Sequence, residues 1–330
     1  MKKKVELSLV DPIYSTYHYQ GLATAALPNN ASLRNWYLNQ SMILTCNRKF
    51  LKGFTTPEIG IEESSWGDSP CFDKVCYEIQ FLKGHSHSVI RNLLDAGYYV
   101  YFSGIDDYYV EGKSWYHERH FNHDGYICGY DQENKTYRLY AYDSNWIFQP
   151  FWTTQKSFNE GLQAQFKKGR FGRIYGIKPK NDQISFSHST ALEKISEYLD
   201  SNMEKYPESS DGTVYGIFVH NYIAKYAEKL YDGSIPHNKM DRRVFRVIWE
   251  HKKAMLQRIE LIEAALQSDN SASKAYKDIV RQADNCRMLY AAHHMKQRDS
   301  VLPIIQKNLL KLKEQEQNIL NNLLQKSKGK

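Results

Sequence analysis

The hydrophobic pattern of the sequence changes near residue 183, and this change constrains the possible folds most strongly. From about residue 186 onward, apolar residues recur at helical spacing and strand signals almost disappear. Helices are predicted at 192–199, 222–231, 245–266, 275–293 and 301–324. Apolar stripes of this kind are typical of a bundle core. We therefore expect a helical domain over residues 183–330.

Residues 1–182 have a different texture, because they are aromatic and repeatedly interrupted by glycine. Leu33–Leu38 and Val89–Leu94 favour short helices, and Tyr98–Phe102 favours a buried strand. Gly125–Tyr130 and Tyr137–Tyr142 flank a polar turn and predict a β-hairpin. The fold class expected for the whole chain is therefore α+β, with an antiparallel sheet in the first domain.

The composition of the chain limits the classes of partner that it is expected to bind. The net charge of +7, from 44 Lys+Arg against 37 Asp+Glu, allows an acidic partner without requiring one. No nucleic-acid-binding motif is recognisable, and no 18 apolar residues run together, so neither nucleic acid nor a membrane is an expected partner. Five cysteines without a disulfide-type spacing, and no signal peptide, indicate a cytoplasmic protein.

The hairpin carries the clearest chemical signal. His123 opens its first strand, and Asp143 ends the returning strand. Residues at the start of one antiparallel strand and the end of its partner lie side by side. Asp143 could then hold His123 in one tautomer, which leaves the other ring nitrogen free to accept a proton.

These residues resemble a known family. A histidine before Gly129-Tyr130-Asp131 and an aspartate after it resemble bacteriocin-processing peptidases with a papain-like fold. The sequence is more similar to the butirosin-type acyltransferases of antibiotic gene clusters, through Tyr98-Tyr99-Val100, Asp106-Asp107-Tyr108-Tyr109, His123 to Asp131 and the block from Phe245 to Lys252. The resemblance implies a papain-like domain over 1–182 that transfers an acyl group from a carrier-protein thioester to an amine.

The family's usual nucleophile is a cysteine at the start of the first helix, where backbone N–H groups and the helix dipole lower its pKa. The matching stretch, Tyr14 to Leu22, contains no cysteine, and its candidate hydroxyls include Ser15 and Thr16. Cys71 follows a passable helix start and is the better substitute among the cysteines. Alternatively, an amine could attack the thioester directly, with His123 as the general base and Asp143 as the carboxylate that orients it.

Other polar groups have plainer interpretations. His117, His120 and His123, with His85 and His87, suggest a metal, but the segment runs into a strand and its ligands would not converge, so no metal site is predicted. Glu62-Glu63 and Asp106-Asp107 are interpreted as exposed turn acids. The basic stretch from Lys167 to Arg170, with Arg173, is either a solvated loop or a receiver for the phosphate of a phosphopantetheine arm.

Three functions are compatible with these features. The first is a carrier-protein-dependent acyltransferase or amide synthase, with an acyl or peptidyl carrier protein and a small amine or peptide-like metabolite as partners. It needs no resident cofactor, because the substrate arrives on a phosphopantetheine arm. The second is a catalytically silent protein that binds such a metabolite or carrier for self-resistance or scaffolding. A true peptidase ranks last, because a peptide bond is not activated and would require the missing cysteine.

Overall fold

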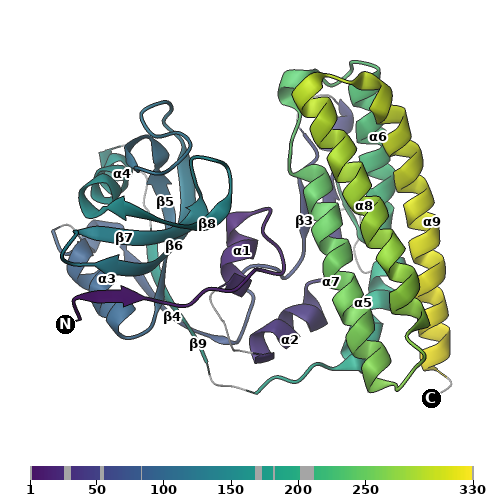
Figure 1. Ribbon diagram of the computed structural model, residues 1–330, viewed down its shortest axis with the longest axis horizontal. Helices are drawn as coiled ribbons and strands as arrows, with labels where there is room; N and C mark the ends of the chain where they lie inside the picture. Colours follow the sequence, from purple (N-terminus) through teal and green to yellow (C-terminus); the bar gives the residue numbers. More distant parts are fainter. Residues whose placement is uncertain are drawn as a thin grey trace. The chain divides into compact units, whose positions relative to one another are not determined.

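The computed structural model describes residues 2–25, 31–52, 56–82, 84–167, 173–180, 183–200 and 212–328. The chain divides into two compact units (Figure 1). Unit 1 comprises Met1–Leu33 and Ser65–Gln183, and unit 2 comprises Arg34–Ser64 and Ile184–Lys330. The change of unit after Gln183 lies next to the predicted boundary. Residues 34–64, however, belong with the helices and not with the first domain, where we expected them.

The reason lies in buried donors on a helix of unit 2. The Arg258 guanidinium donates to the backbone carbonyls of Tyr37, Leu38 and Ser41. His251 binds the carbonyl of Met42 at 2.7 Å. These bonds satisfy carbonyls at the end of one helix and in the turn after it, so the segment is fixed to unit 2 by tertiary hydrogen bonds that no local pattern encodes.

Unit 1 is built on an antiparallel sheet in the order β4-β9-β5-β6-β7-β8, and β1 pairs with the end of β6. The expected hairpin is confirmed, with Tyr130 opposite Tyr137 in the register of its two strands. The described strands of this sheet are β1 (Lys4–Glu6), β4 (Phe72–Glu78), β5 (Tyr99–Asp106), β6 (Asn122–Asp131), β7 (Thr136–Tyr142), β8 (Phe148–Thr154) and β9 (Arg173–Pro179).

Three helices pack on this sheet: α1 (His18–Ala25), α3 (Ser86–Asp95) and α4 (Gln155–Lys167). The apolar side chains of α3 and α4 join those of the central strands in one core, which includes Ile90, Phe102, Ile127, Leu139 and Phe158. Helix α1 comes so close to β8 that a Cβ on Gly21 would lie 2.4 Å from Phe148 Cε1. The close approach of α1 therefore requires glycine at this position.

One local prediction was wrong in a way that matters for the site. Residues 104–107 were expected to form a turn with exposed acids. Instead β5 continues to Asp106, which pairs with Asn122 of β6, and a 3₁₀ turn follows at Asp107–Tyr109. Asp106 and Asp107 are 1% and 0% exposed. The pairing with β6 extends the strand through Gly104 and buries both carboxylates.

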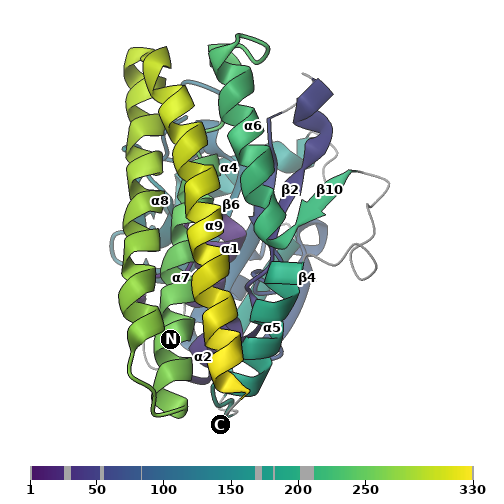
Figure 2. The same cartoon turned by 90° about the vertical axis from the view of Figure 1, so that its right-hand side faces the viewer.

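Unit 2 is mainly helical (Figure 2). The five helices predicted from periodicity are confirmed as α5 (His188–Asp200), α6 (Val219–Tyr231), α7 (Val244–Ala265), α8 (Ser271–Lys296) and α9 (Leu302–Ser327). The segment from residue 34 adds most of α2 (Ala31–Gln40) and the strands β2 (Leu44–Asn47) and β3 (Ile59–Ile61), which form a small sheet with β10 (Thr213–Tyr215). Among the described residues, no helix combines the length and the hydrophobicity needed to cross a membrane.

Candidate functional site

His123 lies near the start of β6, opposite Ile105 of β5. Its Nδ1 makes a short hydrogen bond to Oδ2 of Asp107. The backbone positions this pair, because the N–H of Asp107 donates to the carbonyl of Phe121 at 2.8 Å. The His123 side chain is 22% exposed whereas Asp107 is fully buried. A buried carboxylate thus fixes the ring with Nδ1–H as donor and leaves the lone pair of Nε2 available for a proton.

Asp143, the predicted partner of His123, has a different role. Its Oδ1 accepts from the backbone N–H groups of Asn145 and Ile147, at 2.8 and 2.9 Å, and its Oδ2 accepts from Gln149 Nε2 at 2.6 Å. Burial by itself would raise the pKa of Asp143, but these hydrogen bonds lower it below the usual range. The predicted His123–Asp143 pair is therefore replaced by His123–Asp107, and Asp143 closes a turn after β7.

A buried lysine accompanies the pair. Lys113 Nζ lies 3.6 Å from Oδ1 of Asp107, and both side chains are 0% exposed. An isolated buried charge is very unfavourable, so the ammonium and the carboxylate compensate each other. His123, Asp107 and Lys113 form a row in which a cation stands behind the carboxylate that orients the imidazole.

A second histidine–acid pair adjoins the first. His18, the first residue of α1, makes a 2.8 Å hydrogen bond through Nδ1 to Asp124, and Tyr101 donates to the other oxygen of Asp124 at 2.9 Å. The ring of His18 lies 5.3 Å from that of His123, edge to face. His18 therefore stands where the family resemblance expects a cysteine, at the start of the first helix.

His18 is not available as a base. Its Nε2 accepts the backbone N–H of Tyr142 at 3.2 Å, so both ring nitrogens are engaged in a neutral ring. Burial lowers the pKa of His18, outweighing the opposite effect of the hydrogen bond to Asp124. His18 thus holds α1 against β6 and β7, and among these two histidines only His123 has an open nitrogen.

The predicted hydroxyls lie in the same neighbourhood. Ser15 and Thr16 lead into α1, and their backbone carbonyls accept from the Tyr142 hydroxyl at 2.9 and 3.4 Å. Thr16 is 2% exposed. Their use as nucleophiles stays a prediction.

The cysteines of unit 1 lie elsewhere. Cys71 is buried directly before β4, and Cys76 is exposed within β4. Cys128 is buried in β6, where burial raises the pKa of its thiol to about 12. Its Sγ lies 3.4 Å from the carbonyl of Arg138, away from the histidine end of the strand. A thiol held in this way is a poor nucleophile.

The other sequence signals are dispersed. His120 pairs with Asp106 at 3.0 Å, His117 stacks on Tyr116 at 4.0 Å, and His123 binds Asp107. No group of three or more His, Cys, Asp or Glu in the described ranges could hold a metal ion. Of the basic stretch from Lys167 to Arg170, Lys167 is the last residue of α4 and residues 168–170 lie outside the described residues. Arg173 forms an ion pair of 3.8 Å with Glu78.

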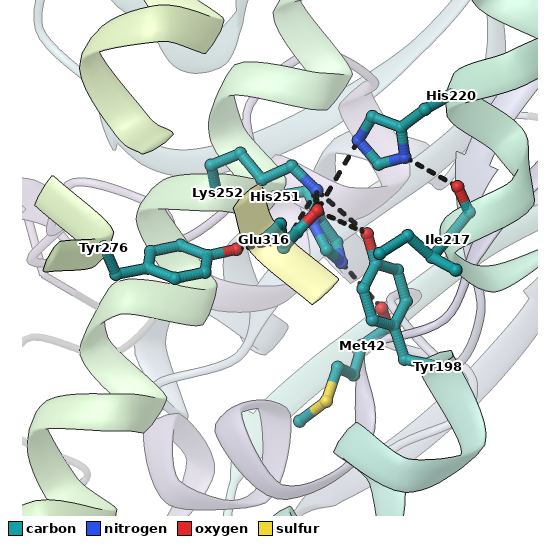
Figure 3. Close-up of polar contacts among 8 residues, drawn as sticks. All are labelled: Met42, Tyr198, Ile217, His220, His251, Lys252, Tyr276 and Glu316. Carbon is teal, nitrogen blue, oxygen red and sulfur yellow. Dashed lines mark hydrogen bonds and ion pairs between the residues drawn. The ribbon is translucent and has the colours of Figure 1, made fainter. Parts of the chain in front are cut away.

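Unit 2 contains a second buried polar cluster, which the sequence did not reveal (Figure 3). Lys252 of α7 lies 2.9 and 2.7 Å from the two carboxylate oxygens of Glu316 on α9, and both side chains are 0% exposed. Tyr198 and Tyr276 donate to the same carboxylate. The pair is thus charge-neutral, and the hydroxyls of Tyr198 on α5 and Tyr276 on α8 also satisfy its carboxylate oxygens.

Two histidines complete this cluster. His251 accepts from Lys252 at 3.3 Å and donates to the Met42 carbonyl, while His220 donates to the Ile217 carbonyl at 2.9 Å (Figure 3). Burial, reinforced by the charge of Lys252, places the pKa of both histidines well below the ordinary value. The cluster fastens α5, α7, α8 and α9 together and is enclosed, so its evident role is structural.

No protein-family model and no curated protein sequence matches this chain. The site in unit 1 is therefore the basis on which a function is inferred. Sequence reasoning missed four of its residues: His18, Asp107, Lys113 and Asp124. One signal was present for Asp107, since a carboxylate in the segment that follows a predicted strand can face the start of the neighbouring strand. Lys113, in a glycine-containing loop, resembled an ordinary surface cation.

Proposed function

We propose that unit 1 catalyses acyl transfer from a carrier-bound thioester to an amine, with His123 as the general base. The observation that carries this proposal is the His123–Asp107 pair, in which a buried carboxylate engages Nδ1 and leaves Nε2 open. This is the arrangement that a histidine needs to accept a proton in a defined direction.

The reaction fits a site whose histidine has no thiol partner among the described residues. The amine nitrogen attacks the thioester carbonyl carbon while His123 Nε2 takes a proton from that nitrogen. The carbon–sulfur bond then breaks, and the protonated imidazole returns the proton to the departing thiolate. The products are an amide and a free thiol. A thioester is activated enough for this route, so no acyl-enzyme is required.

Asp107 and Lys113 support the same step. The carboxylate stabilises the imidazolium that forms when His123 accepts the proton, and Lys113 balances the carboxylate in a buried site. The family resemblance and the papain-like fold that it implies belong to this proposal as well. A carrier protein and a small amine or peptide-like metabolite are its expected partners.

The test is turnover of acyl-pantetheine thioesters with a panel of amines, followed by mass spectrometry. His123→Ala should lower kcat/KM by about 10²–10⁴-fold, the range of general-base catalysis. Asp107→Asn should lower kcat in the same direction. His85→Ala is the matched control, because His85 is an exposed histidine of the same unit. Unchanged turnover in His123→Ala would refute the assignment.

Intact-mass measurement during turnover separates direct attack from covalent catalysis. Direct aminolysis predicts no acylated protein at any time. An acyl adduct on Ser15 or Thr16 would instead establish the covalent route that the sequence left open.

A further inference from the structure

Three aromatic side chains form a chain of ring contacts that begins at the His123 ring. Phe121 lies 4.4 Å from the His123 ring, Trp115 lies 6.5 Å from Phe121, and Trp146 lies 5.4 Å from Trp115, all between ring centroids. Phe121 is 38% and Trp146 is 47% exposed. We call Trp115, Phe121 and Trp146 the aromatic wall. It adjoins the imidazole whose Nε2 is open.

The backbone holds Trp146 in a strained conformation. Its φ of 60° lies in the left-handed region, which bulky residues rarely adopt. The N–H of Trp146 donates to the Asp143 carbonyl at 3.0 Å, and the Asp143 carboxylate accepts from Asn145, Ile147 and Gln149. Such strain persists where the surroundings fix it and is concentrated at ligand sites. The turn built by Asp143 therefore presents the Trp146 indole beside Trp115.

A cation lies on the same wall. The Arg119 guanidinium is 5.5 Å from the centre of the Trp115 ring and 5.7 Å from that of Phe121. Arg119 is exposed, and in the part of the chain that the structure describes no carboxylate pairs with it. A guanidinium stacked on aromatic rings keeps its N–H donors free for an anion. The wall thus combines aromatic faces with an anion-binding group.

We propose that the aromatic wall and Arg119 bind an acyl donor that has two recognised parts: a flat aromatic ring in its acyl group and a phosphate on its thiol arm. The ring would stack against Trp146 and Trp115, with the thioester toward His123 and the phosphate on Arg119. This inference rests on the proposed function and specifies the substrate class of that site. Ring–ring contacts favour an aromatic over an alkyl acyl group of similar size, because edge-to-face and stacked arrangements of two rings are more favourable than the burial of the same apolar area alone.

Calorimetric binding separates the two parts of the ligand. Non-reactive amide analogues of benzoyl-phosphopantetheine, hexanoyl-phosphopantetheine and unphosphorylated benzoyl-pantetheine serve as probes. The wild-type protein should bind the benzoyl probe about tenfold more tightly than the hexanoyl probe. Trp146→Ala should remove this preference. Trp152→Ala is the control, since Trp152 is an exposed tryptophan on β8 of the same unit, 38% exposed.

The phosphate is tested with Arg119→Gln, which should bind phosphorylated and unphosphorylated benzoyl probes equally. Equal affinity of the wild-type protein for benzoyl and hexanoyl probes would overturn the inference, and so would an equal loss in Trp146→Ala and Trp152→Ala. Asp143→Asn, which loosens the turn without removing the indole, should weaken the benzoyl preference in the same direction.

The two proposals fail separately. Binding to His123→Ala should keep the aryl preference, because His123 acts on the amine and not on the ring. If His123→Ala is inactive but no aryl preference exists, only the aromatic wall proposal fails. If the aryl preference exists but no amide forms with any amine, only the proposed function fails.

Discussion

Lys113 and Asp107 form a fully buried ion pair, with 3.6 Å between Nζ and Oδ1, directly behind the histidine that we propose as the base. The pair makes the electrostatics of His123 depend on a lysine that does not touch it. Further charged and titratable groups near His123 include His18 and its partner Asp124, which Tyr101 also contacts. Lys113 influences both histidine–acid pairs, because its positive charge also lowers the pKa of His18 and of Asp124.

Lys113→Met should therefore lower kcat. Removal of the ammonium leaves the buried Asp107 carboxylate without its cation and disturbs the hydrogen bond by which this carboxylate orients His123. Turnover of acyl-pantetheine thioesters measures the effect. Lys113→Arg keeps the charge and should retain more activity than Lys113→Met. Turnover of Lys113→Met equal to that of the wild-type protein would show that the lysine does not contribute to the catalytic step.

Substitutions of Asp107 and Asp143 should change different steady-state constants. Asp107→Asn removes the carboxylate that orients the base, so it should lower kcat by roughly 10²-fold or more. Asp143→Asn acts on the turn that presents Trp146, so it should raise KM and leave kcat within about twofold. A fall in kcat for Asp143→Asn as large as that for Asp107→Asn would restore the sequence-based assignment of Asp143 to catalysis.

The buried pair of unit 2 predicts a non-additive stability effect. Lys252→Met leaves the Glu316 carboxylate buried without its cation and should reduce the free energy of unfolding by about 3–5 kcal/mol. The double variant Lys252→Met/Glu316→Gln should lose less than the sum of the two single variants, because no uncompensated charge remains. Arg281→Met is the control, since the Arg281–Asp278 pair is exposed and should contribute under about 1 kcal/mol. Urea unfolding of the wild-type protein and the four variants provides the measurement, and strict additivity would contradict the coupling.

Acid should destabilise the same cluster. The pKa of His220 and of His251 is well below the ordinary value in the folded state, mainly through burial. Below a pH of about 6.5 the unfolded chain therefore binds protons that the folded chain does not, and the stability present above this pH is lost as the pH falls. Each histidine contributes a slope of about 1.4 kcal/mol per pH unit in this range.

His220→Gln removes one of these groups and should make the loss of stability between pH 6 and pH 5 shallower by about that amount. Urea unfolding across this range provides the measurement, with the exposed His85→Ala as the control. An identical slope in the wild-type and His220→Gln proteins would mean that His220 binds its proton as readily in the folded protein as in the unfolded chain.

The sequence by itself determined the secondary structure where a pattern repeats. The helices α5 to α9 follow from their apolar periodicity, because a helix that buries one face needs that spacing whatever it packs against. The hairpin of β6 and β7 follows from two alternating segments around a polar turn. Strands β4, β8 and β9, and helix α4, were not predicted from these patterns.

Only the tertiary structure decided which groups meet. The sequence identified His123 but paired it with Asp143, because the start of the first strand of a hairpin lies beside the end of the second strand. The actual partner, Asp107, directly follows β5, whose pairing with β6 includes a register shift between Phe102 and Ile105. In the same way, Lys113 is buried by the fold around it, and residues 34–64 belong to unit 2 through bonds from Arg258. Local patterns reflect the face that an element buries, whereas contacts between distant carboxylates and cations depend on strand order and loop closure, which local patterns do not record.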